Sequence, residues 1–484
     1  MQQVTAKDTM SSSGDNSDNH GGDHVAKNQD APPDAKIQQD LIRENDSSSQ
    51  LTEDNWLRSI WDFFESKSRS VNIGHLLLVL LGLHLFAMSF PNSASIFDES
   101  YYVGTYHFDQ DLLNLIPSNL EHPFFGKIWG ALGIYLFGDN FFGWRIFYVL
   151  IGILTVWVFY ELALVFFSKG KALFAASLLG FETLFFIHTT AALLEGTPLL
   201  FGLLGFLLYF KKKYYLSAIA FGLSILSKEW GLYFVIALFL YHVYFVIGSK
   251  PLSRKAWSKF IIFVAILALV VSLPLWAYDT AYHPISSNGT PITNPIQNFE
   301  YYYSYQTSLK ISANDALDPW HFAWNWINPL TVSPDTYYAE SVTFSVNTTL
   351  PNGTSYNRVT LVTTPIDYLG IGNLVIWYSI WAIVPFIILK PLISKKLTKI
   401  EAFVGSWILA TYGPSLLLSA VIHRVVYAFY FINVDPGLAL GIPMLISFIA
   451  PKDSFTERAL IALWLGAAIV FFFIFFPVRP VPGL

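Results

Sequence analysis

Several ionisable residues lie in short clusters between the apolar stretches of the chain, and their types suit acid–base and anion-binding chemistry. Asp98-Glu99 presents two adjacent carboxyls, while Glu121-His122 and Lys127 combine an acid, an imidazole and an ammonium. The other members are Arg145, Glu182, His188, Glu195, Lys228, Glu229, His423 and Arg424. Carboxylates can transfer protons, and arginine and lysine can bind phosphate. This chemistry requires that the surrounding elements bring the clusters together.

The composition predicts an integral membrane protein. Hydrophobic residues make up 54% of the chain and charged residues only 13%, whereas a soluble domain carries roughly 25% charged residues. The apolar residues collect in runs of about 17 to 25, the length that crosses a hydrocarbon core of ~30 Å. The net charge of −5 gives no indication of nucleic-acid binding. The absence of cysteine excludes disulfides, thiolate metal sites and cysteine nucleophiles.

The apolar runs predict an all-α polytopic protein with about eleven transmembrane helices. The predicted helices cover residues 73–90, 141–167, 172–188, 194–210, 214–227, 231–248, 258–276, 369–389, 400–420, 427–449 and 457–476. With the N-terminus in the cytosol, most lysines and arginines fall in the short inner loops, as the positive-inside rule requires. The apolar stretch Ile128–Phe137 is too short to span and is predicted to lie in the outer interface of the first outer loop.

The chain is predicted to consist of four regions. Residues 1–70 are predicted to form a disordered acidic cytosolic tail that ends in a short interfacial helix at Trp56–Phe64. Residues 71–277 form the transmembrane catalytic module, and residues 369–484 form the C-terminal transmembrane helices. Residues 278–368 are predicted to form an ordered extracytoplasmic cap after helix seven. They contain glycosylation sequons at Asn288, Asn347 and Asn352, which agree with an outer location.

The ionisable clusters fall at the predicted outer ends of the helices. A charge at the bilayer centre costs at least ~2.5–3.5 kcal/mol, so charges that are retained near the membrane usually serve a function. The predicted topology allows these helix ends to converge on one pocket at the outer leaflet boundary. Such a pocket would hold acids for proton transfer and cations for a phosphate, which suits a lipid-linked phosphate ester.

Three segments of the first outer loop and the second helix resemble a known family. Ile96-Phe97-Asp98-Glu99-Ser100-Tyr101-Tyr102 resembles the Asp-Glu motif of the protein O-mannosyltransferases, which belong to the GT-C superfamily of polytopic glycosyltransferases. Glu121-His122-Pro123-Phe124-Phe125-Gly126-Lys127 is similar to the family's His-Pro segment before an interfacial helix. Arg145 resembles the arginine that begins the family's second helix.

Two further positions continue the resemblance, which covers roughly residues 73 to 250. Glu195 takes the place of an acid in the family's third or fourth helix, and Lys228 lies in a turn similar to the family's Lys-Trp turn. Phe124 replaces a usual second proline, and Thr189-Thr190 stands where an arginine is expected before Glu195. The loop after helix seven is too short for the family's β-trefoil insertion, which indicates an archaeal or bacterial relative.

The resemblance implies sugar transfer from a polyprenyl-phosphate or dolichyl-phosphate donor to a hydroxyl of a protein or a glycan, by a single displacement with inversion. Asp98 is expected to act as the general base, because partial desolvation raises the basicity of a carboxylate. Glu99 is expected to position the acceptor or to hold the loop. The expected substrate-binding residues are Glu121, His122, Lys127, Arg145, Glu195, Lys228, His423 and Arg424. Arg424 is the strongest candidate for the phosphate, because a guanidinium can bind it in a bidentate manner.

Each candidate also has a purely structural alternative. His122-Pro123 can begin a helix, Lys127 can extend to the interface, and Lys228 can pair with Glu229. Alternative functions are an aminoarabinose-type lipid A transferase of the same superfamily or a secondary transporter, although no internal repeat of the kind common in transporters is evident. No metal and no cofactor is expected. The predicted location is the cell membrane or the endoplasmic reticulum membrane, and a homo- or heterodimer remains open.

Overall fold

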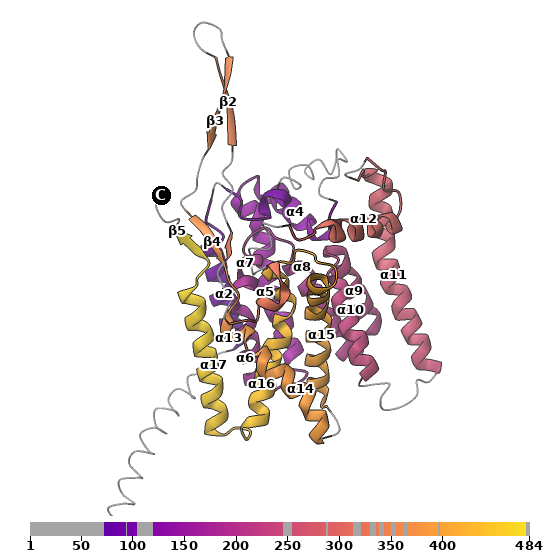
Figure 1. Cartoon of the computed structure of the whole chain (residues 1–484), viewed down its shortest axis with the longest axis vertical. Coiled ribbons are helices and arrows are strands. Elements are labelled where there is room, and N and C mark those ends of the chain that lie inside the picture. The colour runs from indigo at the N-terminus through magenta and orange to yellow at the C-terminus, as the bar shows by residue number, and fades with distance from the viewer. Residues whose placement is uncertain are drawn as a thin grey trace, which may run out of the picture. The chain divides into compact units, whose positions relative to one another are not determined.

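The computed structural model describes most of the chain after residue 71. The described residues are 72–92, 94–103, 120–244, 254–286, 289–312, 321–329, 335–337, 343–349, 355–361, 366–394 and 397–480. The predicted tail at residues 1–70 and its helix at Trp56–Phe64 lie outside them, as do the sequons at Asn288 and Asn352. Figure 1 shows a bundle of roughly parallel and antiparallel helices, with α4, α12 and the strands gathered at one end.

The N-terminal helices follow the predicted apolar runs closely. They are α2 (Ile73–Ala87), α4 (Ile128–Phe137), α5 (Phe141–Ala163), α6 (Lys169–Gly180), α7 (Thr183–His188), α8 (Gly196–Phe210), α9 (Tyr214–Ser227), α10 (Gly231–His242) and α11 (Arg254–Tyr282). The 3-10 helix η2 (Phe124–Gly126) precedes α4. The short helix predicted at Ile128–Phe137 is present, and it packs against α5 where Gly133 meets the backbone of Gly143.

One predicted helix, at residues 172–188, is broken into α6 and α7. Glu182 stands between them with an extended backbone, and its carboxylate accepts a hydrogen bond from the Phe185 amide at 2.6 Å. This side chain therefore begins a new helix in the middle of the apolar run, as N-cap residues do. Gly180 at the end of α6 lies directly against the side chain of Leu80 in α2.

The C-terminal helices depart from the prediction at two starting points. They are α13 (Leu374–Trp377), α14 (Ile380–Ser394), α15 (Lys399–Ala420), the 3-10 helix η7 (Ala428–Asn433), α16 (Asp435–Ile449) and α17 (Phe455–Ile474). The helix predicted at 369–389 begins later, because residues 366–370 form a strand. The helix predicted at 427–449 begins as η7, and α16 then starts with Pro436 in its first turn, a position where proline costs no hydrogen bond.

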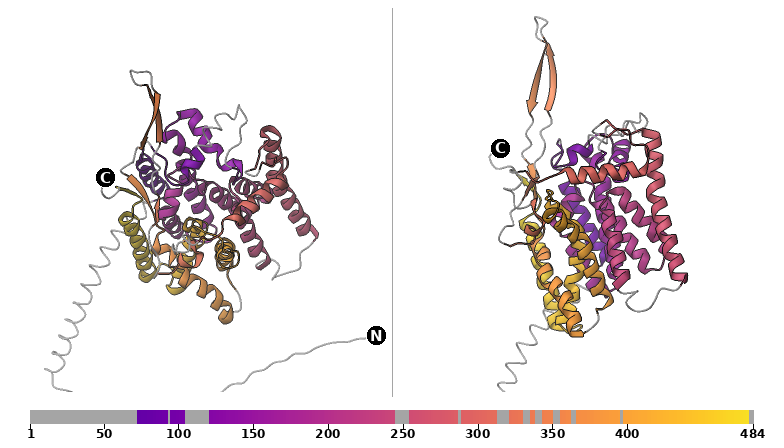
Figure 2. Two further views of the ribbon diagram at one scale, coloured as in Figure 1. Left: turned by 45° about the horizontal axis from the view of Figure 1, so that its top comes forward. Right: turned by 45° about the vertical axis from the view of Figure 1, so that its right-hand side comes forward.

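Among the described residues, five helices are long and apolar enough to cross a membrane by length and composition. They are Phe141–Ala163, Ser258–Tyr282, Leu374–Ser394, Lys399–Ala420 and Phe455–Ile474. Six further apolar helical stretches are shorter, including Ile73–Ala87 and Gly196–Phe210. The multi-pass character of the chain is therefore clear, while the count of eleven spans remains a prediction. Figure 2 shows the helices up to α11 (indigo to magenta) and α13–α17 (orange to yellow) as neighbouring groups.

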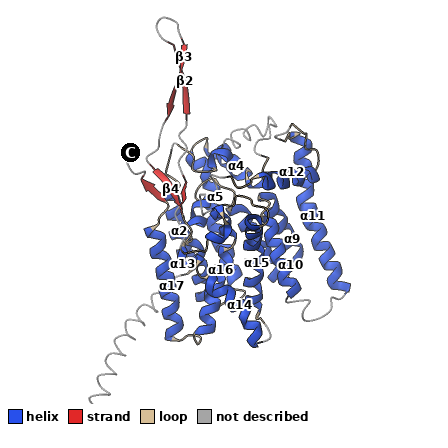
Figure 3. Ribbon diagram, in the orientation of Figure 1, coloured by secondary structure: helices blue, strands red, loops and turns tan. Residues whose placement is uncertain are grey.

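The all-α expectation is wrong for part of the predicted cap. The cap contains α12 (Pro295–Ser308) and the 3-10 helix η6 (Ala323–Asn325). It also contains the strands β1 (Asp335–Tyr337), β2 (Thr343–Thr349) and β3 (Ser355–Leu361), and β4 (Ile366–Gly370) begins at its end. Strands β1, β4 and the C-terminal β5 (Val478–Pro480) form an antiparallel sheet in the order β1-β4-β5, and β2 pairs with β3 (Figure 3). Threonine, tyrosine and valine are frequent in this stretch and favour strands.

Candidate functional site

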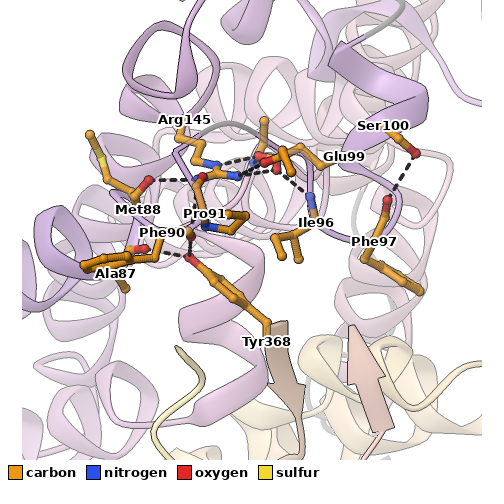
Figure 4. A network of polar contacts seen from close by, with 12 residues as sticks. Ala87, Met88, Phe90, Pro91, Ile96, Phe97, Glu99, Ser100, Arg145 and Tyr368 are labelled. Atoms are coloured by element: carbon orange, nitrogen blue, oxygen red, sulfur yellow. Dashed lines mark hydrogen bonds and ion pairs between the residues drawn. The ribbon is translucent and has the colours of Figure 1, made fainter. Parts of the chain in front are cut away.

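The first outer loop is fixed to α5 by a buried ion pair between Glu99 and Arg145 (Figure 4). Arg145 donates to the two carboxylate oxygens of Glu99 at 2.7 and 2.6 Å. Its remaining donors bind the backbone oxygens of Met88, Pro91 and Ala94 at 2.8, 3.0 and 3.2 Å. All three nitrogens of the guanidinium thus donate hydrogen bonds to residues 88–99, which lead into the loop and form its start. This geometry does not fit the expected contact between Arg145 and a phosphate.

Glu99 is fully buried and binds three separate segments. Besides Arg145, its carboxylate accepts from the Ile96 amide and from the Ala192 amide, both at 2.8 Å. Tyr368 of β4 adds a further tie, because its hydroxyl donates to the Ala87 and Phe90 backbone oxygens at 2.7 and 2.8 Å (Figure 4). Of the two roles expected for Glu99, this geometry favours holding the loop.

Asp98 stands next to this anchor and is only half-buried. The residue before it, Phe97, adopts φ 52°, a left-handed conformation that is uncommon for a bulky side chain. The Phe97 ring packs edge-on against Phe429 with centroids 5.6 Å apart. The buried Glu99 on one side and the packed Phe97 on the other therefore fix the backbone that presents Asp98.

Four acids lie within electrostatic range of Tyr102. Burial raises the pKa of Tyr102 well above its ordinary value, and the negative charges nearby raise it further. These charges belong to Asp98, Glu195, Glu229 and Glu121. Burial together with Glu121, Tyr430 and Asp98 raises the pKa of Tyr305 in α12 to about 12. Acids from the first loop and from two helix junctions thus lie within electrostatic range of one tyrosine, and two of them, Asp98 and Glu121, also lie within range of α12.

The segment His122–Lys127 meets the turn between α9 and α10. His122 Nδ1 and a carboxylate oxygen of Glu229 are 2.8 Å apart, and Lys127 Nζ donates to the His122 backbone oxygen at 2.9 Å. Gly126 makes this approach feasible, because a side chain there would collide with the Ser227 backbone oxygen. Burial lowers the pKa of His122, although the charge of Glu229 opposes this effect. The lowered pKa favours the neutral imidazole, which can bind the carboxylate by donating from Nδ1.

Lys228 and Glu195 form a second buried ion pair, with Nζ and Oε1 2.6 Å apart. The other oxygen of Glu195 is 2.8 Å from His188 Nδ1, and Lys228 lies 4.1 Å from the centre of the Trp230 ring. A buried carboxylate that lies between an ammonium and an imidazole stays ionised, because both neighbours favour the charged form. The expected alternative pairing of Lys228 with Glu229 does not occur as an ion pair. The Lys228 charge is neutralised by Glu195 instead.

Arg424 is buried, and its hydrogen bonds to the residues that the structure describes all go to neutral oxygens. Its Nε donates to the Gln306 backbone oxygen at 2.6 Å, and Nη1 donates to the Val425 backbone oxygen at 2.8 Å. Nη2 donates to the side-chain oxygen of Gln306 and, at 3.1 Å, to the Tyr430 hydroxyl. In the described part of the chain, no carboxylate forms an ion pair with Arg424. It differs in this respect from Arg145 and Lys228.

The remaining predicted residues fall around the same end of the bundle. Glu121 lies within electrostatic range of Tyr102 and Tyr305. His423 is exposed, has φ 53° and accepts a hydrogen bond at its backbone oxygen from the Ile311 amide at 3.0 Å. It is therefore tied to the cap through its backbone rather than through its imidazole. Over the ranges that the structure describes, no group of three or more His, Cys, Asp or Glu side chains is placed to hold a metal ion.

Sequence reasoning missed two residues of α12 that join this site, Tyr305 and Gln306. Gln306 Nε2 donates to Glu229 Oε1 at 2.9 Å, while its two oxygens accept from Arg424. An uncharged glutamine in a polar helix carries no signal of its own. The only available hint was the location of α12 in the stretch predicted to cover the outer surface.

Comparison with known families gives a match over residues 121–278, to the family described as dolichyl-phosphate-mannose-protein mannosyltransferase. This range contains His122, Lys127, Arg145, Glu195 and Lys228 and excludes Asp98 and Arg424. None of the curated protein sequences matches the chain.

Several solved structures share the fold. The S. cerevisiae protein O-mannosyltransferase Pmt1-Pmt2 complex bound to the sugar donor is similar with a TM-score of 0.55 and 14% identity, over 84% of this chain and 89% of that one. The Archaeoglobus fulgidus oligosaccharyltransferase has a TM-score of 0.50 and 13% identity, over 83% and 55%. ArnT from Cupriavidus metallidurans in the apo state has a TM-score of 0.50 and 12% identity, over 83% and 75%. The resemblance to the protein O-mannosyltransferases is confirmed.

Proposed function

We propose that this chain, a GT-C type membrane glycosyltransferase that resembles the protein O-mannosyltransferases, transfers a sugar from a polyprenyl-phosphate or dolichyl-phosphate donor to a hydroxyl acceptor. The reaction takes place at the end of the bundle that carries the first loop and α12, which we assign to the extracytoplasmic face. The acceptor is a serine or threonine of a protein, or a glycan hydroxyl. A secondary transporter is not retained as an alternative.

The observation that carries this proposal is the buried charge of Arg424. Burying an ion is costly unless an opposite charge compensates it, and the buried Arg145 and Lys228 both have a carboxylate partner. Among the described residues, the guanidinium of Arg424 donates hydrogen bonds to neutral oxygens and forms no ion pair with a carboxylate. A phosphate from the donor would supply the missing negative charge and bind through charge-assisted hydrogen bonds. Arg424 is therefore the residue that binds the donor phosphate in our proposal.

Asp98 is the proposed general base. In the reaction, the acceptor oxygen forms a bond to the anomeric carbon while the bond from that carbon to the phosphate oxygen breaks, and the configuration at the carbon inverts. The acceptor proton passes to the Asp98 carboxylate, and the lipid phosphate leaves with the electron pair of the broken bond. Arg424 would stabilise the charge that develops on the phosphate. The fixed backbone on both sides of Asp98 supports this assignment, because a base must be held in place to act.

Mannose is the sugar that we propose, because the description of the matched family names mannose and dolichyl phosphate. An aminoarabinose-type transferase remains the second candidate, since the fold is also that of ArnT. The direct test supplies purified protein in lipid nanodiscs with radiolabelled dolichyl-phosphate-mannose and a Ser/Thr-rich peptide. Label in the peptide supports the proposal. Transfer from an aminoarabinose donor to lipid A, with none from the mannose donor, would replace it with the second candidate.

A further inference from the structure

Gln306 occupies the space between two charged groups of the candidate site. Its side-chain oxygen accepts from Arg424 Nη2, and its side-chain nitrogen donates to Glu229 Oε1 at 2.9 Å. The backbone oxygen of the same residue accepts from Arg424 Nε at 2.6 Å. One residue of α12 thus binds one edge of the guanidinium with two oxygens and binds a carboxylate with its amide nitrogen.

The polarity of the amide has a specific consequence. A carboxylate in this position would pair with Arg424 and neutralise it, and an ammonium would repel it. The amide offers an acceptor to the cation and a donor to the anion from two separate atoms while remaining neutral. The other oxygen of Glu229 lies 2.8 Å from His122 Nδ1. Both oxygens of this acid are therefore occupied by other partners, and Glu229 forms no ion pair with Arg424.

We propose that Gln306 is a positioning residue that keeps Arg424 available for the donor phosphate by preventing an internal ion pair with Glu229. This inference rests on the proposed role of Arg424 and extends it to α12. Without the amide, a buried cation and a nearby carboxylate would attract each other strongly in a low-dielectric environment. The phosphate would then have to break this ion pair before it could bind.

The backbone around α12 is arranged to hold Gln306 in this place. Residues 309–311 after α12 lie alongside residues 423–425: the Val425 amide donates to the Leu309 oxygen at 3.0 Å, and the Ile311 amide donates to the His423 oxygen at 3.0 Å. Lys310 Nζ also donates to the Ile422 oxygen at 2.8 Å. The docking of α12 therefore does not depend on the Gln306 side chain alone. Substitutions of Gln306 should leave α12 in place.

The test measures binding of radiolabelled dolichyl phosphate to the purified full chain in nanodiscs. Gln306→Ala should weaken binding roughly tenfold or more, the usual size of a lost charge-assisted contact. Glu229→Gln in the same chain should restore most of this loss, because the competing carboxylate is gone. A role confined to docking α12 predicts the opposite, since the double variant would then lack two contacts. A double variant that binds no better than Gln306→Ala would overturn the proposal.

Two further variants make the result independent of folding. Gln306→Glu keeps the size of the side chain and places a carboxylate on Arg424, so it should bind dolichyl phosphate at least tenfold more weakly at pH 8. Gln297→Ala is the matched control, because this residue also lies on α12 and its side-chain oxygen accepts from Thr293, away from Arg424. It should bind like the wild type. Wild-type affinity in Gln306→Glu would overturn the inference. Sugar transfer is not part of this readout, so its failure would count against the proposed function alone.

Discussion

Arg145 and Glu99 form a buried bidentate ion pair that fixes the first outer loop to the second predicted spanning helix, at 2.7 and 2.6 Å. Asp98 directly precedes Glu99 in the chain. The fully buried ion pair of Glu99 therefore also fixes the position of the candidate base. The two adjacent acids of the motif therefore have separate tasks in our account. Glu99 holds the loop, and Asp98 is the proposed general base.

Loss of this ion pair should destabilise the fold. Removal of one partner of a buried ion pair typically costs about 3–5 kcal/mol, because the other charge stays buried and unpaired. Arg145→Ala should therefore lower the apparent melting temperature and the yield in detergent. Glu161→Gln removes the partly exposed pair with Lys211 at 3.3 Å, for which ~0–1 kcal/mol is expected. Equal melting temperatures for the two variants would contradict the anchoring role.

Arg424→Ala should weaken the use of the lipid donor. A charge-assisted contact is typically worth ~1.5–3 kcal/mol, which corresponds to a loss of roughly tenfold to a hundredfold in kcat/KM for the donor. Arg424→Lys should recover only part of the loss, because a point charge cannot reproduce the planar guanidinium. Donor titrations with a fixed acceptor peptide measure this effect. An unchanged donor dependence in Arg424→Ala would remove this residue from the site.

The partly buried His122–Glu229 pair should make stability depend on pH. Burial lowers the pKa of folded His122, so the unfolded chain, whose histidine titrates near ~6.5, takes up a proton more readily. Stability from this residue is therefore lost as the pH falls below ~6.5. Melting in detergent between pH 8 and pH 5 should show a smaller decrease for His122→Gln than for the wild type. Superimposable pH profiles would exclude a contribution from His122.

The sequence predicted the helices most accurately where an apolar run has charged boundaries. The predicted helix 214–227 coincides with α9, because Lys211–Lys213 precede it and Lys228 follows it. The break at Glu182 was missed, since a single acid in an apolar run gives no local indication that it will cap a new helix. The strand at Ile366–Gly370 was also missed, because its pairing with Val478–Pro480 joins residues over a hundred positions apart.

In the candidate site, too, residue types could be predicted from the sequence, while contacts between distant residues could not. The residue types at 98, 122, 195, 228 and 424 were recognised from chemistry and from family motifs. Their pairing could not be predicted, because Arg145 and Lys228 look like free cations until their buried carboxylate partners are seen. Gln306 could not be found at all, since its contacts depend on how α12 packs over the site.

The orientation can be tested with single cysteines, because the natural chain contains none. Ser304 in α12 and Ser394 at the end of α14 are both exposed and lie on the predicted outer and inner sides. In intact cells, an impermeant thiol reagent should label Ser304→Cys and should leave Ser394→Cys unlabelled until the membrane is opened. The reverse pattern would place the site on the cytosolic side.

In the proposed reaction Asp98 removes the acceptor proton, and Asp98→Asn tests this role most directly. The substitution keeps size and hydrogen bonding but removes the basic carboxylate, and loss of a general base typically slows a reaction ~10²–10⁴-fold. Asp139→Asn is the matched control, since Asp139 is exposed and accepts a hydrogen bond from Trp144 Nε1 at 2.7 Å. The measurement is sugar transfer from a radiolabelled lipid-phosphate donor in nanodiscs, together with binding of dolichyl phosphate.

We predict that Asp98→Asn binds the lipid phosphate like the wild type and transfers almost no sugar, while Asp139→Asn does both normally. Turnover of Asp98→Asn close to that of the wild type would contradict the proposed mechanism.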